Sequence, residues 1–202
     1  MGRISNAKQR LMEAALQLIW SNSYGSTTVD AICEKAGVKK GSFYYFFESK
    51  CELAVVAIQE DWVEKKKVLD TLFSPTQEPL DRLSAFFAKV YEKQVEVHAK
   101  TGQVLGCPLA TLGSEICTQE KSIQAKVSEL MEQYMRYFES AIRDAITNGS
   151  IEACNVKSKA EFLFSYMHGA LGQARIKNDL EGLRNLTEGA MEILKAREVQ
   201  KI

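Results

Sequence analysis

The sequence predicts an all-α protein with two parts, an N-terminal three-helix head that contains a helix-turn-helix and a C-terminal helical body. Three observations support this fold class. Apolar residues recur three and four positions apart through the 202-residue chain, and no stretch of any length alternates with the period of a strand. Two capping-box patterns and a glycine divide residues 27–50 into two short helices and the start of a long one. Proline and glycine breaks then separate the later helices. We expect the head to span residues 1–49 and the body residues 50–202.

The first helix is expected to begin at Ala7, after a loose arm of residues 1–6. A turn at residues 22–26 ends this helix, and Gly25 marks the turn. The apolar residues of the helix form one face that would be buried against the two short helices, namely Leu11, Ala14, Ala15, Leu18 and Ile19.

The stretch that follows has the pattern of a helix-turn-helix. Thr27 and Asp30 have the spacing of a capping box, and Gly37 supplies the positive-φ residue that usually follows a helix. A second short helix starts within residues 39–42 and carries Phe43 and Phe47 on one side. Two short helices joined by such a turn can place the second helix in the major groove of DNA.

A second capping box, Ser49 with Glu52, opens a long helix that is expected to reach about Phe73. Two prolines break the chain at residues 74–79. The remaining helices are expected over residues 80–100, over a short stretch after Pro108, and over residues 121–148, 157–177 and 180–197.

Charge is unevenly distributed, although the formal net charge of the whole chain is zero. Residues 1–50 hold seven Lys or Arg and four Asp or Glu, so the remainder holds nineteen basic and twenty-two acidic residues. A basic end and an acidic body favour a local phosphate-facing surface. The five cysteines include no CxxC pair, which fits reduced thiols, and no signal peptide or long apolar run is visible. We therefore expect a cytoplasmic protein that does not enter a membrane.

Side chains of the second short helix have the chemistry needed for DNA. Lysines suit phosphates, while Ser42, Tyr44 and Tyr45 suit the backbone or base edges. The competing interpretation is an ordinary helical protein, since two helices around a glycine with scattered lysines are common. On the residues alone both interpretations stay open.

The head resembles the N-terminal domain of the TetR/AcrR (tetracycline-repressor) family of transcriptional regulators. The matching segments are AKQRLMEAALQLI at 7–19, TTVDAICEKAGVKKGSFYYFF at 27–47 and SKCEL at 49–53. Two positions depart from the family, which often has His at Phe46 and Ser, Thr or Ala at Lys39. The resemblance implies a ligand-responsive repressor that binds a palindromic double-stranded DNA operator. The expected DNA-binding residues are Thr27, Thr28, Lys39, Lys40, Gly41, Ser42, Tyr44, Tyr45, Phe46 and Lys50.

The resemblance also implies a homodimer and a pocket for an unknown small-molecule effector. The apolar arc of residues 121–148 is wider than one neighbour requires, and the next helix carries small residues, so the expected dimer interface is Met135, Phe138, Ile142, Gly169, Ala170 and Gln173. The competing interpretation is that both helices pack only within one chain. The expected pocket residues are Trp62, Phe86, Phe87, Tyr91, Cys107, Met131, Tyr134, Tyr166 and Met167, each of which could equally be core.

Cys107 supports an alternative function for the same fold. It stands just before an expected helix start, where backbone dipoles favour a thiolate, and GCPLATLGSE resembles a subset of the family that senses oxidants or electrophiles through a cysteine. A buried cysteine is more often a small hydrophobe. An enzyme is not expected, because GxSxG, HExxH, Walker A and GxGxxG patterns are missing and His98 and His168 lack metal-ligand spacing. We expect no cofactor and no metal. A helical adaptor that binds protein and not DNA is the remaining class.

Overall fold

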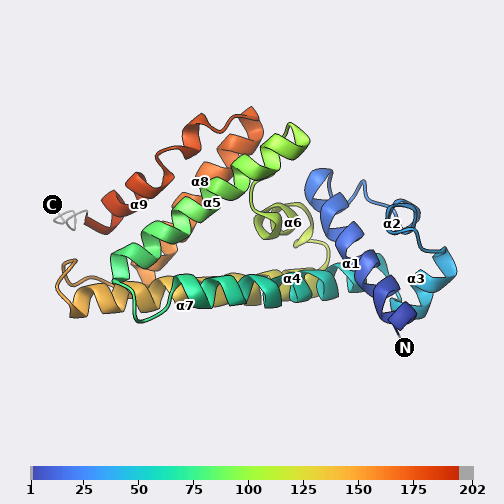
Figure 1. Cartoon of the computed structure of the whole chain (residues 1–202), viewed down its shortest axis with the longest axis horizontal. Coiled ribbons are helices and arrows are strands. Elements are labelled where there is room, and N and C mark those ends of the chain that lie inside the picture. Colours follow the sequence, from blue (N-terminus) through green and yellow to red (C-terminus); the bar gives the residue numbers. More distant parts are fainter. Residues whose placement is uncertain (1, 196–202) are drawn as a thin grey trace. The chain divides into compact units, whose positions relative to one another are not determined.

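The computed structural model describes residues 2–195, and the regular structure within this range is helical throughout (Figure 1). The all-α prediction is therefore confirmed. The elements are α1 (Gly2–Ser21), α2 (Val29–Ala36), α3 (Lys40–Phe46), α4 (Lys50–Leu72), α5 (Pro79–Thr101), α6 (Pro108–Ile116), α7 (Lys121–Thr147), α8 (Val156–Lys177), the 3₁₀ helix η1 (Glu181–Leu183) and α9 (Leu186–Lys195). None of these helices combines the length and apolar character needed to cross a membrane.

The chain forms two compact units. The first contains the residues up to Lys65 together with Pro108–Met131, and the second contains Lys66–Cys107 and the residues from Glu132 on. Both α4 and α7 contribute residues to each unit. The predicted boundary between residues 49 and 50 stays a prediction.

In the first unit α1 packs against α2, α3 and α6, and α2 packs against α3. The predicted face of α1 is buried at Leu11, Ala14, Ala15 and Ile19, as the spacing of its apolar residues requires. The expected loose arm is wrong over residues 2–6, because α1 begins at Gly2, and residue 1 of the prediction lies outside the described part of the chain. The segment from Gly2 to Ala7 holds no proline that would stop the helix from extending.

Capping explains where the short helices begin and end. The residue that caps α2 is Thr28, whose hydroxyl accepts the N–H of Ala31 at 3.1 Å, so the predicted cap at Thr27 is wrong by one residue. Gly37 has φ of 60°, as predicted, and ends α2. Ser49 caps α4 as predicted, accepting the N–H of Glu52 at 3.1 Å.

The core of the second unit is an aromatic cluster contributed by α5, α7, α8 and the residue after α4. Phe86 meets Phe138 edge to face with ring centroids 5.0 Å apart. Such edge contacts add to the burial of the rings. The other members are Phe73, Phe87, Tyr134 and Phe164.

Buried polar groups hold the turns of this unit. Arg82 is 4 % exposed and donates to the carbonyl oxygens of Pro75 and Gln77 and to the carboxylate of Asp144. The proline-rich turn before α5 is thereby fixed to α7. Asn178 adopts φ of 50° after α8, and its side chain binds the backbone of Gly102 and Val104.

The last predicted helix, over residues 180–197, is divided into η1 and α9. The carboxylate of Asp179 accepts the N–H of Glu181 at 2.9 Å, which favours a tight turn in place of a continuous helix. Residues 196–197 of the prediction lie outside the described part of the chain.

Candidate functional site

The solvent-facing side of α3 exposes two large aromatic side chains. Tyr44 is 56 % and Tyr45 is 73 % exposed, whereas Phe43 on the opposite side is fully buried. Tyr45 meets the half-buried ring of Phe46 edge to face, with centroids 5.0 Å apart. Phe43 therefore anchors α3 in the head while the tyrosines stay available for a partner.

Cations and small residues precede these tyrosines at the start of α3. Lys39 is the exposed N-cap of α3 and makes no side-chain cap hydrogen bond. Lys40 pairs with Asp30 of α2 at 2.8 Å, and the hydrogen bond to this carboxylate raises the pKa of Lys40. Gly41 is exposed, and a Cβ there would meet no heavy atom within 4 Å. The backbone of α3 can thus be approached closely at Gly41, next to half-buried Ser42.

Two of the predicted DNA contacts have structural roles. Thr27 is 2 % exposed and its hydroxyl donates to the carbonyl of Ser23 at 2.6 Å, so this side chain has no surface to offer a phosphate. The Lys50 ammonium donates to the carbonyls of Tyr24 and Thr27 at 2.7 and 2.8 Å and lies over the Tyr24 ring. Burial lowers the pKa of Lys50. The burial of Thr27 corrects its predicted phosphate contact. Lys50 also holds the turn before α2, and its predicted phosphate contact stays a prediction.

A carboxylate from α6 holds the same turn. The two oxygens of Glu115 accept the N–H groups of Tyr24 at 2.8 Å and Gly25 at 2.7 Å. Burial, the Cys51 thiol and the carboxylate of Glu120 raise the pKa of Tyr24 to about 12. The α1–α2 turn that positions the helix-turn-helix is therefore held by residues of α4 and α6.

In the second unit, several predicted pocket residues belong to the core. Phe86 and Phe87 lie in the aromatic cluster, and Met167 is 4 % exposed. Trp62, in the first unit, is 3 % exposed. The rings of Phe86 and Phe87 pack against other rings of the cluster, and their part in an effector pocket stays a prediction. An effector pocket that includes Tyr91, Met131 or Tyr134 stays a prediction.

The turn that carries Cys107 is fixed by polar contacts within the second unit. Gly106 adopts φ of 68°, and buried Gln94 binds both its N–H, at 2.9 Å, and its carbonyl, at 3.3 Å. Arg175 of α8 donates to the carbonyl of Leu105 at 2.8 Å. The half-buried Cys107 forms a side-chain hydrogen bond with His168 of α8.

Comparison with known proteins decides the family. The model "Bacterial regulatory proteins, tetR family" matches residues 11–57, and "Tetracyclin repressor-like, C-terminal domain" matches residues 79–190. The second match alone spans more than half of the chain. The chain belongs to the TetR family. It is thus a helix-turn-helix transcriptional regulator.

Relatives of this TetR-family protein match along nearly its whole length. The repressor DhaR of Mycobacterium sp. (strain GP1) is 26 % identical over 93 % of this chain and 91 % of its own. The regulatory protein TetR from Rhodobacter sphaeroides is 27 % identical, with a TM-score of 0.80 over 91 % of this chain and 96 % of its own. The reduced form of Escherichia coli NemR is 19 % identical, with a TM-score of 0.79 over 96 % and 100 % of the two chains.

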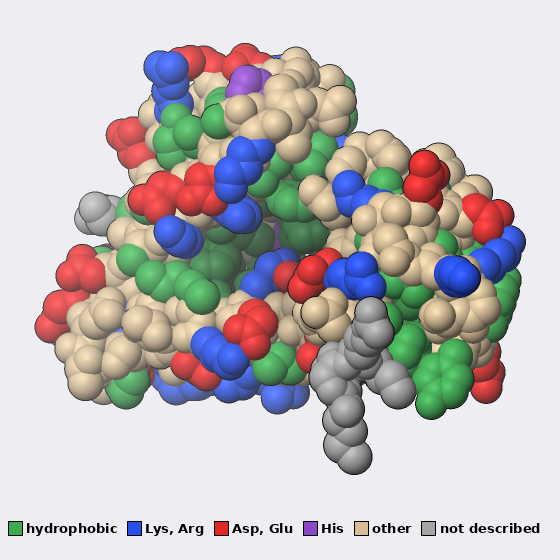
Figure 2. Space-filling model, turned by 45° about the vertical axis from the view of Figure 1, so that its right-hand side comes forward, with side chains coloured by type: hydrophobic (Ala, Val, Ile, Leu, Met, Phe, Trp, Pro, Cys, Tyr) green, Lys and Arg blue, Asp and Glu red, His purple; other side chains and the backbone are tan. Residues whose placement is uncertain are grey.

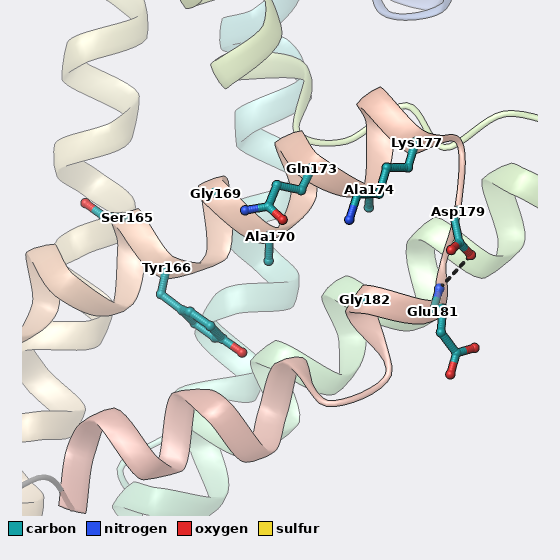
Figure 3. Close-up of a pocket in the computed structure, with 10 residues that line it drawn as sticks. All are labelled: Ser165, Tyr166, Gly169, Ala170, Gln173, Ala174, Lys177, Asp179, Glu181 and Gly182. Carbon is teal, nitrogen blue, oxygen red and sulfur yellow. Dashed lines mark hydrogen bonds between the residues drawn. The ribbon is translucent and has the colours of Figure 1, made fainter.

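The outer side of α8 borders a hollow of about 550 Å³ that ends at η1 (Figure 3). The predicted interface residues Gly169, Ala170 and Gln173 line it, as does Tyr166 from the predicted pocket. In Figure 3 the Tyr166 side chain extends from α8 toward the helix drawn below it. The close approach of its hydroxyl to Gly189 identifies this helix as α9.

The predicted dimer interface on α7 needs correction, because Phe138 and Ile142 are fully buried within one chain. Met135 is half-buried. Sequence reasoning missed two exposed apolar residues on α8, Phe162 at 61 % and Ile176 at 85 %. They stand seven residues to either side of Gly169, a spacing that places all three on one face of a helix. On the face of the molecule that Figure 2 shows, positively and negatively charged side chains are interspersed.

Proposed function

We propose that this TetR-family protein is a repressor that binds a palindromic operator as a homodimer and leaves it when a small effector binds its body. The observation that supports DNA recognition most strongly is the exposed side of α3, where Tyr44 and Tyr45 stand beside Lys39 and Gly41. A folded head has no structural need for two largely exposed tyrosines on one turn of a short helix. Their chemistry suits sugar, phosphate and base edges.

Within this interface each group has a proposed role. Lys39, Lys40, Thr28 and Tyr44 contact phosphates and set the position of α3 on the duplex. Gly41, Ser42 and Tyr45 lie nearest the bases, because the N-terminal half of a recognition helix reaches the base edges. The Lys40–Asp30 pair is exposed on both sides, so a phosphate can replace the carboxylate as partner.

The outer side of α8 is the proposed dimer contact. Phe162 and Ile176 expose apolar surface, and the small residues Gly169 and Ala170 between them allow close approach of a second helix. A twofold dimer places two heads on half-sites about one helical turn apart, roughly 34–36 Å. Phe162→Glu with Ile176→Glu is expected to give a monomer by sedimentation, whereas Val95→Glu, at an apolar side chain exposed on α5, leaves the dimer intact.

Effector binding and operator binding oppose each other in this proposal, because each ligand favours a different arrangement of the protein and the coupling is reciprocal. The protein acts where chromosomal DNA is accessible, in the cytoplasm. The direct test is selection of bound duplexes from a random-sequence pool, followed by release with candidate effectors. Recovery of a palindromic motif supports the repressor. Failure to enrich any motif, with a retained fold, would favour the helical adaptor.

A second candidate is a thiol-based sensor of electrophiles or oxidants with the same operator function. The observation that favours it is the hydrogen bond between Cys107 and His168 at the residue that directly precedes α6. The relative NemR of E. coli has been solved in a form described as reduced. Cys107→Ser is expected to abolish DNA release by diamide while operator binding is retained. Unchanged release by diamide would exclude Cys107 as the sensor.

A further inference from the structure

The Cys107 thiol hydrogen-bonds to the imidazole of His168, and a second hydrogen bond of this ring fixes which of its nitrogens carries the proton. His168 Nδ1 lies 2.9 Å from the carbonyl oxygen of Phe164, one turn earlier in α8. A carbonyl oxygen is only an acceptor, so Nδ1 carries a hydrogen and donates it. In the neutral ring Nε2 is then unprotonated and is the nitrogen that can accept the S–H of Cys107.

The ring is held in this orientation by its neighbours. Phe164 packs against the imidazole edge to face, with ring centroids 4.2 Å apart, and Phe164 in turn contacts Tyr134 and Phe138 of α7. On the thiol side, Gln94 of α5 clamps the backbone of Gly106. Both partners are therefore positioned by the fold and do not depend on a flexible loop.

We infer that His168 is the proton acceptor of Cys107, and that the pair forms a site for covalent capture of soft carbon electrophiles such as activated alkenes. The inference rests on the second function proposed above and adds a residue to it, since a thiol becomes an effective nucleophile when a neighbouring base takes its proton. His168 thereby distinguishes Cys107 from the other cysteines of the chain.

The electrostatic surroundings agree with this assignment. Burial lowers the pKa of His168, but the hydrogen bond and charge of Cys107 and the Phe164 carbonyl outweigh it, so the pKa stands above its ordinary value of 6.5. The turn before Cys107 is also bound by the Gln94 amide, which is neutral, and by the Arg175 guanidinium at the Leu105 carbonyl. A nearby cation favours the thiolate form. By contrast, burial raises the pKa of Cys33, Cys51 and Cys117.

The addition balances without a further reactant. The S–H proton moves to Nε2 of His168, which leaves a thiolate beside an imidazolium. The sulfur electron pair forms a bond to the β-carbon of an activated alkene, and the π electrons of the double bond move toward the activating carbonyl. The α-carbon then takes the proton from the imidazolium, which restores neutral His168 and leaves a thioether on Cys107.

The test is the pH dependence of alkylation in the full-length protein. Samples are treated with limiting N-ethylmaleimide between pH 5.5 and 9, and the labelled cysteine peptides are quantified by mass spectrometry. The Cys107 rate is expected to reach half its maximum well below pH 8.5, the ordinary thiol pKa. In His168→Gln the midpoint should rise by about one unit or more, which lowers the rate at pH 7 on the order of tenfold. Cys117 and Cys154, in the same samples, are the internal controls.

A second measurement keeps the inference testable if His168→Gln unfolds. The imidazole signal of His168 is titrated by NMR in the wild type and in Cys107→Ala, with His98→Gln used for assignment. Loss of the thiol is expected to lower the His168 midpoint. An ordinary Cys107 pH profile in the wild type, or a His168 midpoint unmoved by Cys107→Ala, would overturn the inference. Fast, His168-dependent alkylation supports the pair even if the adduct fails to release DNA, a result that would reject only the sensor function.

Discussion

Replacing Glu115 with alanine removes the carboxylate that α6 contributes to the turn between α1 and α2. Two hydrogen bonds are lost, from the N–H groups of Tyr24 at 2.8 Å and Gly25 at 2.7 Å. Hydrogen bonds to charged groups contribute about 1.5–3 kcal/mol each. Gly25 is exposed and water can replace its partner, so we count the bond to the buried Tyr24 backbone as the main loss. The free energy of unfolding should fall by about 1.5–3 kcal/mol.

Thermal unfolding measures this loss. For a chain of this size the expected decrease in Tm is roughly 2–4 °C for each kcal/mol at a fixed protein concentration. Glu13→Ala is the matched control in the same unit, since its exposed carboxylate accepts a single hydrogen bond from Gln9 at 3.0 Å. The control should change stability by less than about 0.5 kcal/mol. Glu115→Gln, which keeps an acceptor oxygen without the charge, should lie between the two.

The proposed role of Glu115 would be refuted if Glu115→Ala were no less stable than Glu13→Ala. A second consequence concerns DNA. Because the turn positions α2, and through it α3, a loosened turn should weaken operator binding even at temperatures where Glu115→Ala is fully folded. Unchanged operator affinity in the folded variant would show that other contacts position the helix-turn-helix.

Three further predictions concern single residues. Lys39→Ala should weaken binding to all DNA sequences and reduce the slope of log K against log salt by about 1.8, since each of the two Lys39 side chains of the dimer accounts for about 0.9. Lys93→Ala on α5 should leave the slope unchanged, and a loss of sequence preference alone would contradict the phosphate role. Gly189→Ala should destabilise the protein by about 1–3 kcal/mol in thermal unfolding, because its Cβ would clash with the Tyr166 hydroxyl. Tyr166→Leu should reverse most of the loss, and additive effects of the two changes would argue against the clash. The pKa of the Tyr24 hydroxyl is raised from 10.0 to about 12, so the neutral hydroxyl contributes stability that is fully present below pH 10 and is lost as the pH rises toward 12. Tyr24→Phe should therefore flatten the decrease in Tm across this pH window. An equally steep decrease in Tyr24→Phe would show that other groups cause the loss of stability.

Much of the head could be predicted because local chemistry determines it. The Gly37 turn, the Ser49 cap and the buried face of α1 each depend on residues within a few positions of one another. The cap of α2 shows the limit of this reasoning. Either of the two adjacent threonines has the hydroxyl needed to cap α2. Thr28 is the cap because the Thr27 hydroxyl is instead hydrogen-bonded to the carbonyl of Ser23.

Lysine and aromatic residues were harder to assign, because their roles depend on partners far away in the sequence. Lys50 was predicted as a phosphate contact, yet two carbonyls of the α1–α2 turn bind its ammonium. Phe138 and Ile142 belong to the predicted dimer interface because the apolar arc of α7 is wider than one neighbour requires. In the structure both are buried in the same chain, Phe138 within the aromatic cluster. Periodicity reports which residues avoid water but does not report which element covers them.

The same limit applies to the body. Nothing in the spacing of the chain brings His168 to Cys107, which depends on how α8 packs against the turn after α5. The face of α8 that carries Phe162, Gly169 and Ile176 has a seven-residue spacing that sequence reasoning could have detected. The sequence-based prediction used Gly169 only as a small residue and did not include Phe162 and Ile176, seven residues to either side of it.

Binding of the full-length protein to its selected operator, measured by fluorescence anisotropy from 50 to 300 mM salt, tests the central claim most directly. A dimer that places two α3 helices in successive major grooves should neutralise roughly six to ten phosphates, so log K should fall against log salt with a slope of about −5 to −9. Tyr45→Ala should reduce the preference for operator over random duplex and leave that slope nearly unchanged. Binding that is insensitive to salt, or equal for operator and random duplex in the wild type, would contradict the proposed interface.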